Sequence, residues 1–432
     1  MRSALVLATV LAACALFGVV AVGCLSKPRF ECAGNADCLQ GAIQGTCEPD
    51  SFCSFPDSSC PSGQRYGDLS GPQANQCVGV PIDAPPDAFV PDTYVHDARE
   101  CFGGSGAYQI CLDMMPPMGN VTLAGTLDTV MDPRCMAMPA SWMTANQPDA
   151  CLILGKSITI ATTTVTGARP LVILGDTIAI NGTLDVASHR GQPAGPGAPF
   201  ASCTAFPQAP ANNASGGGGG AGGSFKTKGG DGGDGKGGSL PGLAPPALAV
   251  NPTVLRAGCS GQTGGTGVAA AGAPGRGGGA VFLTASRITF SASGAINASG
   301  AGAVGGGNLS GGSGGGSGGM IVLHAAEAIT GTTGAKLIAN GGGAASGATA
   351  AAGVSGNDPS LATPTTPATG GDAGNQAGTG GAGFAGVTAA TTGQSAGGAR
   401  DTGGGGGGGG GFIQTNLALT NITSSPAATV VP

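Results

Sequence analysis

Asp185, His189 and Arg190 form the main concentration of chemically useful side chains in this sequence, directly after a short apolar segment. A polysaccharide lyase or hydrolase needs an acid, a base and a cation on one face. The same residues also fit a polar turn that leaves a strand, and this is the interpretation that we favour. We therefore assign no catalytic residue, and a polysaccharide-acting enzyme remains an alternative.

Glycine motifs carry little weight here, because 87 of the 432 residues are glycine. Segment 229–238 approaches a phosphate loop, but Gly237 stands where a Ser or Thr hydroxyl must reach magnesium. Segment 311–315 matches a nucleophile elbow without the apolar strand and the helix that the elbow requires. Asp401 opens an Asp-Thr-Gly triplet that has no second copy to supply a partner carboxylate. The sequence therefore predicts no catalytic residue and no cofactor.

The cysteines indicate an oxidising compartment. Of 14 cysteines, those other than Cys14 and Cys24 divide evenly into two groups of six, as expected for disulfides in an exported chain. There is no CxxC pair and the 3 histidines lie far apart, so we predict no metal site. The pairing stays open, because six cysteines in one module allow many connectivities. The disulfide candidates are Cys32, Cys38, Cys47, Cys53, Cys60, Cys77, Cys101, Cys111, Cys135, Cys151, Cys203 and Cys259.

Residues 1–24 read as a lipoprotein signal peptide with its anchor cysteine. Arg2 precedes a long apolar run, and small residues precede two candidate cysteines. We favour lipidation at Cys24, because cleavage before Cys14, the alternative, would leave an exposed apolar tail. An uncleaved signal anchor is a further alternative, since about 18 apolar residues span a bilayer. Each outcome places the chain outside the cytoplasmic membrane, in the cell envelope, as an outer-membrane or cell-surface protein.

The composition excludes some classes of partner. The net charge is -6, so no basic patch is available to neutralise phosphates, and we predict no binding to nucleic acid. Only 4% of the residues are aromatic and 9% are charged. The core must therefore come from Val, Ile, Leu and Ala.

Four self-similar apolar segments, starting at Arg169, Gly278, Gly318 and Gly410, set the expected fold. Each has a run of apolar residues followed, after a polar kink, by an alternating pair typical of a strand. Strands this short bury their apolar faces only by stacking on copies of themselves. The prediction is an all-β chain with a parallel β-helix or β-solenoid-like region that carries long glycine-rich insertions.

The rest of the chain divides by composition. We expect a disulfide-rich module at residues 28–80, an Asp/Pro-rich stalk at 81–100, and the glycine-rich solenoid-like domain at 101–432, with its N-terminal cap at about 101–168. For the glycine-rich insertions we expect order near the strands and disorder at the tips. A disulfide between Cys203 and Cys259 would fix the base of the first insertion.

This order of lipobox, cysteine-rich module, Asp/Pro stalk and glycine-rich strands resembles bacterial surface lipoproteins that carry a glycine-rich, adhesin-like parallel β-helix region. The glycine-rich half is also similar in composition to the glycine-rich regions of PE-PGRS proteins, although a signal peptide and a disulfide module stand in place of their PE domain. No functional residue is carried over from either resemblance.

The leading expectation is a non-enzymatic surface lipoprotein with an adhesive, matrix-contacting or structural role. Its partners would be the membrane, through the lipid anchor, and an extracellular polysaccharide or surface protein. The alternatives are an extracellular polysaccharide lyase or hydrolase on the β-helix, and a glycan- or cell-wall-binding module in the cysteine-rich unit.

Overall fold

A computed structural model of the chain describes residues 30–79, 100–104, 106–112, 118–198, 203–397 and 401–431. The chain divides into two compact units, residues 1–95 and 96–432, which are described separately. Cys14, Cys24 and residues 81–99 of the expected stalk lie outside the described residues. In the described part of the chain, no helix combines the length and hydrophobicity that crossing a membrane requires.

The first unit is a small antiparallel module held by three disulfides, Cys32–Cys47, Cys38–Cys53 and Cys60–Cys77. Its buried cluster consists of cysteines of the first two bridges, with Phe55 packed against them, so the covalent links take the place of a larger core. Its strands are β1 (Leu39–Gln40), β2 (Ile43–Gln44), β3 (Thr46–Cys47), β4 (Cys53–Pro56) and β5 (Gln64–Tyr66), with short 3-10 turns at Asn35–Asp37 and Gly71–Gln73.

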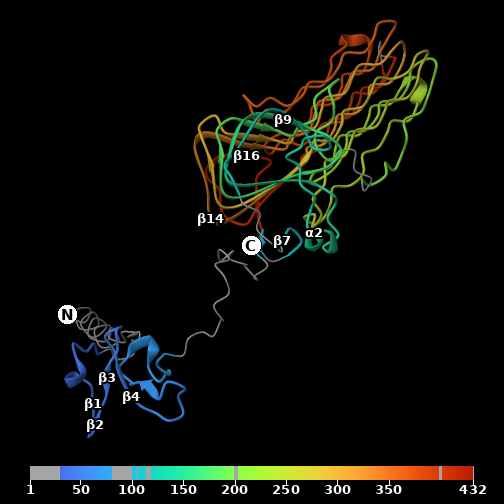
Figure 1. Ribbon diagram of the computed structural model, residues 1–432. Helices are drawn as coiled ribbons and strands as arrows, with labels where there is room; N and C mark the ends of the chain where they lie inside the picture. The colour runs from blue at the N-terminus through green and yellow to red at the C-terminus, as the bar shows by residue number, and fades with distance from the viewer. Residues whose placement is uncertain are drawn as a thin grey trace, which may run out of the picture. The chain divides into compact units, whose positions relative to one another are not determined.

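The second unit is built on one ten-stranded parallel sheet that winds into a solenoid-like stack (Figure 1). The four recurring segments supply eight of its strands, and residues 121–166 supply the other two, β8 and β9. This confirms the expected all-β, solenoid-like architecture. The strands are β8 (Val121–Asp128), β9 (Cys151–Thr166), β10 (Leu171–Ile180), β11 (Thr183–Asp185), β12 (Ala280–Phe290), β13 (Ala295–Asn297), β14 (Met320–Ile338), β15 (Phe412–Thr415), β16 (Thr420–Ser425) and β17 (Thr429–Val430).

Equivalent residues of successive turns lie directly beside one another in the sheet. Leu171 pairs with Cys151 on one side and with Val281 on the other. Val281 pairs in turn with Ile321, and Ile321 with Ile413. All five side chains are fully buried in the interior cluster, so each turn contributes one layer to a continuous aliphatic core.

The first strand segment of each turn is buried on its outer face as well. Val172 and Phe282 point into a second cluster, where Trp142 and Ile110 cover them. Trp142 lies in helix α2 (Ala140–Thr144), and its ring stacks on Phe282 with centroids 6.1 Å apart. Burial on both faces explains why these segments are continuous apolar runs while the following segments alternate.

The region expected as an N-terminal cap supplies both the first layer and this outer cover. Strand β8 pairs with β9 and forms the first layer of the stack. The hairpin of β6 (Glu100–Phe102) and β7 (Ile110–Leu112) packs with α2 against the outer cluster, on the flank of the stack.

The glycine-rich insertions form an ordered bundle of extended strands. They span residues 186–279, 298–319 and 339–411, and each leaves the third strand segment of one turn and returns at the first segment of the next. Because they share this corner, they run alongside one another away from the sheet (Figure 1). Backbone hydrogen bonds join them along their described length, so the expected disorder at the tips is not found.

The bonding repeats every three residues, which is the period of a polyglycine or polyproline II helix. Three segments, one from each insertion, bond in a closed cycle in which the first donates to the second, the second to the third and the third to the first. The N–H to C=O pairs, all between 2.8 and 3.1 Å, are 217 to 309, 220 to 312, 223 to 315, 312 to 403, 315 to 406, 318 to 409, 403 to 217, 406 to 220 and 409 to 223.

Candidate functional site

A cavity of about 330 Å³ opens where the outer face of the sheet changes from apolar to polar. Phe282, Val322 and Gln414 are neighbours across strands β12, β14 and β15. The next outward positions are His324, at the end of the first segment of β14, and Asn416, directly after β15. The positions equivalent to His324 are Leu154, Leu174 and then Thr284, so the outward face becomes polar toward the last turns, which present amide and imidazole groups.

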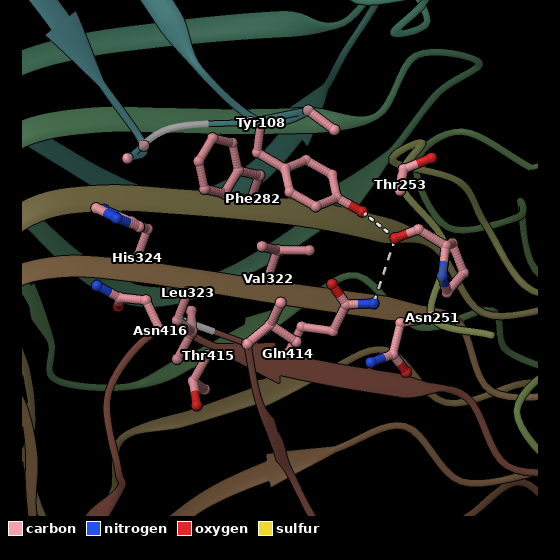
Figure 2. Close-up of a pocket in the computed structure, with 16 residues that line it drawn as sticks. Tyr108, Asn251, Thr253, Phe282, Val322, Leu323, His324, Gln414, Thr415 and Asn416 are labelled. Carbon is pink, nitrogen blue, oxygen red and sulfur yellow. Dashed lines mark hydrogen bonds between the residues drawn. The ribbon is translucent and has the colours of Figure 1, made fainter.

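Tyr108 and the segment 251–253 form the opposite wall of the cavity (Figure 2). The Tyr108 ring lies against Phe282, with centroids 5.7 Å apart. Its hydroxyl donates a 2.6 Å hydrogen bond to the carbonyl oxygen of Pro252, and the Gln414 amide nitrogen donates to the same oxygen at 3.4 Å. The first insertion is therefore joined to both the hairpin and the sheet at this point.

Asn416 is held as an extension of the sheet. Its side-chain carbonyl accepts a hydrogen bond from the Ala325 backbone N–H at 2.9 Å, and its amide nitrogen donates to the Ala325 carbonyl at 2.8 Å. These two bonds imitate strand pairing beyond the end of β15. They fix the amide beside His324 at the rim (Figure 2).

The polar groups of this cavity are neutral at neutral pH. Burial lowers the pKa of His324, so its imidazole is uncharged, and burial raises the pKa of Tyr108 well above its ordinary value. No Asp or Glu is among the described residues that line the cavity. An aromatic wall, an aliphatic floor and neutral donors and acceptors suit a neutral polar ligand.

The residues singled out from the sequence occupy a different place. Asp185 ends β11, and its carboxylate lies 2.8 Å from Nε2 of His189. The other ring nitrogen of His189 lies 3.7 Å from Asp358, in the third insertion. Arg190 donates through its backbone N–H to Asp358 and through its guanidinium to the carbonyl oxygen of Gly356. The structure thus brings the three predicted residues together, as a link between the end of β11 and the third insertion.

This link fixes the charge of the imidazole. The hydrogen bond with Asp185, and then that with Asp358, raise the pKa of His189 to about 10, against the effect of burial. Burial would raise the pKa of Asp358, but its bonds with His189, Gly302 and Arg190 lower it. A protonated imidazole between two carboxylates cannot accept a proton, so His189 is a poor general base at neutral pH.

All twelve cysteines beyond Cys24 are paired. Beside the three disulfides of the first unit, the second contains Cys101–Cys111, Cys135–Cys151 and Cys203–Cys259. The last of these closes the base of the first insertion. Cys32, Cys38 and Cys47 lie close enough together to resemble a metal site, but each is in a disulfide and offers no thiolate.

The first unit has a groove of its own, with a volume of about 440 Å³. The apolar side chains of Phe30, Leu39 and Leu69 line it and are about half exposed, at 45%, 62% and 48%. Asp37 and Asp68 also line it. This groove is where the alternative of a binding module in the cysteine-rich unit would act.

Sequence reasoning missed the cavity beside Tyr108, although a signal for part of it exists. When the recurring segments are aligned, the outward positions read Leu154, Leu174 and Thr284, and then His324. A histidine at a position that is apolar in the first copies marks a change of environment. The contribution of Tyr108 has no such signal, because it depends on where the hairpin packs.

Comparison of the whole chain with protein families, characterised proteins and solved structures found no match.

Proposed function

We propose that this protein is a non-enzymatic lipoprotein of the cell envelope, anchored through Cys24, that displays a parallel β-helix and binds a neutral sugar of an extracellular polysaccharide in the cavity beside Tyr108. The six disulfides and the signal-like N-terminus support the location. The observation that carries the binding role is the uncharged cavity itself.

The lining of this cavity complements the two kinds of surface of a sugar, its apolar C–H face and its hydroxyl groups. The ring of Tyr108, backed by the buried ring of Phe282, offers an apolar wall on which the C–H face of a pyranose packs. Gln414, Asn416 and His324 gather amide and imidazole groups across from the Tyr108 ring, within reach of sugar hydroxyls (Figure 2). The volume of about 330 Å³ accommodates one or two sugar rings.

Two further observations support a binding role over catalysis. Glycoside hydrolysis uses a pair of carboxyl groups about 5 to 10 Å apart, and the described lining of this cavity contributes none. The alternative centre at Asp185 has its imidazole engaged by two carboxylates at 2.8 and 3.7 Å. That arrangement suits a structural link better than proton transfer.

The test is retention of the mature protein on immobilised neutral oligosaccharides, with Tyr108→Ala and His324→Ala beside the unmodified protein. We expect the unmodified protein to bind at least one neutral oligosaccharide. Tyr108→Ala removes the aromatic wall and should weaken that binding about tenfold, equivalent to about 1.4 kcal/mol. His324→Ala should weaken it by several-fold, because one polar contact at the rim is lost.

The matched control is Tyr66→Ala in the first unit, which removes the same side chain outside the cavity and should leave affinity unchanged. Equal binding by Tyr108→Ala and the unmodified protein would contradict the proposal. So would a protein that retains no neutral oligosaccharide while its circular dichroism shows the intact fold.

A further inference from the structure

A second, smaller cavity lies where all three insertions meet the stack. Its volume is about 200 Å³. The first insertion contributes His189, Arg190 and Arg276 to its lining, and the second contributes Gly302 and neighbouring residues. The third insertion reaches the same place through Asp358, which accepts the backbone hydrogen bond of Gly302 at 2.7 Å. The lining therefore contains three basic side chains and, among the described residues, no acidic one.

The three basic side chains of this cavity differ in their hydrogen bonds and ion pairs. His189 is held between Asp185 and Asp358, so these two carboxylates offset its charge. Arg190 is tied by its guanidinium to the carbonyl oxygen of Gly356. Arg276 is exposed, and within the described part of the chain its guanidinium has no hydrogen bond or ion pair. A guanidinium with free donors at the edge of a cavity is suited to a planar or tetrahedral oxyanion.

We propose that this cavity binds the acid group of a sugar, a carboxylate or a sulfate ester, on an acidic extracellular glycan. Arg276 donates the direct hydrogen bonds, and the guanidinium of Arg190 adds a second positive charge to the lining, while the charge of His189 is offset by Asp185 and Asp358. The cavity is smaller than the one beside Tyr108, so it admits the acid group and the ring that carries it. The protein as a whole is acidic, with a net charge of -6, which makes this local excess of basic groups a selective feature.

The experiment is titration of the mature protein with glucuronate, glucose 6-sulfate and glucose at moderate ionic strength, followed by calorimetry or NMR. Variants Arg276→Gln, Arg276→Lys and Arg287→Gln are measured in parallel. Arg287 is an exposed arginine of β12, paired with Glu327 and not among the cavity residues, so its substitution is the matched control for lost positive charge.

We expect at least one of the two acidic sugars to bind at least tenfold more tightly than glucose. Arg276→Gln should weaken this binding about tenfold, Arg276→Lys should weaken it less, and Arg287→Gln should have no effect. Tighter binding of glucuronate assigns the site to carboxylates, and tighter binding of glucose 6-sulfate assigns it to sulfate esters. Arg276 is exposed, so loss of folding is not expected in these variants.

Three outcomes would overturn the assignment. The first is equal affinity for glucose and both acidic sugars. The second is unchanged binding in Arg276→Gln, and the third is an equal loss in Arg287→Gln, which would indicate attraction by overall charge alone. His324→Ala separates this site from the neutral-sugar cavity, because it should leave binding of the acidic sugar intact. Failure of the proposed function at the cavity beside Tyr108 would not affect any of these results.

Discussion

At the scale of single residues, the two described histidines of the second unit have opposite environments, and this decides their chemistry. His189 faces a carboxylate at each ring nitrogen, at 2.8 and 3.7 Å. His324 is half-buried at the rim of a cavity that no described carboxylate lines. One imidazole is therefore held in the charged form and the other in the neutral form, so their effects on stability appear in different pH ranges.

His189 should stabilise the fold across neutral pH and lose that effect in base. Its pKa rises from about 6.5 in the unfolded chain to about 10 in the folded protein, because of Asp185 and then Asp358. The contribution is fully present below about pH 6.5, declines between pH 6.5 and 10, and is lost above that range. We expect His189→Gln to lower the free energy of unfolding by about 1 kcal/mol at pH 6, since the ion pair is partly screened by solvent.

Urea denaturation of the unmodified protein and of His189→Gln from pH 6 to pH 10.5 measures this effect. The difference between their free energies of unfolding should shrink as the pH rises. His324→Gln serves as the control, because burial lowers the pKa of His324 and any pH dependence it brings lies below about pH 6.5. A constant difference between His189→Gln and the unmodified protein over the whole range would contradict the ion-pair interpretation.

Sequence alone identified part of this centre. Asp185 and His189 are four residues apart after one strand, so their proximity was visible in the sequence. Asp358 lies in another glycine-rich insertion, and no local pattern connects it to His189. The contact exists because insertions one and three leave the stack at the same corner, which is a property of the folded chain.

At the scale of elements, the backbones of the glycine-rich insertions are closely packed against one another. Gly407 lies so close to Ala382 that an added Cβ would overlap its carbonyl oxygen, and Gly222 stands in the same relation to Gly407. A hydrogen-bonded neighbour on each side leaves no space for a side chain. Glycine is thus required here for close backbone approach, as in other polyglycine II arrangements.

Replacing one of these glycines with alanine should destabilise the second unit. We expect Gly407→Ala to lower the free energy of unfolding by about 1 to 3 kcal/mol, the usual cost of overpacking. Gly397→Ala is the matched control from the same insertion, because an added Cβ there meets open space and the backbone is not left-handed. Equal urea midpoints for the two variants would show that the bundle does not contribute to stability.

The strands were predictable and the bundle was not, for a physical reason. Short apolar runs followed by alternating pairs recur in self-similar copies from Arg169 onward, and this repetition indicated strands in a solenoid-like stack. A glycine tract has the same composition whether it is solvated or packed. Whether a tract packs depends on hydrogen bonds that recur every three residues with the other two insertions, such as the bond from Gly220 to Gly312. The register of these bonds cannot be read from one segment.

At the scale of the whole molecule, each of the six disulfides lies within one of the two units. Three bridges lie within the first unit and three within the second, and among the described cysteines no bridge joins the two units. Of the 14 cysteines in the sequence, the bridges account for all except Cys14 and Cys24. Twelve cysteines paired in this way are compatible with an oxidising compartment. The two remaining cysteines both lie in the apolar N-terminal segment.

The two cysteines outside the bridges, Cys14 and Cys24, allow a test of the proposed lipid anchor. Cys24→Ala should move the protein from the membrane fraction to the medium and remove a diacylglycerol adduct from its intact mass, because in the proposed function the lipid on Cys24 retains the mature chain. Cys14→Ala is the matched control, a second cysteine removed from the same segment, and it should change neither result. The opposite pattern would assign lipidation to Cys14. If the unmodified protein were found in the medium, the anchor would be removed from the proposed function. Both proposed sugar-binding cavities could still be tested.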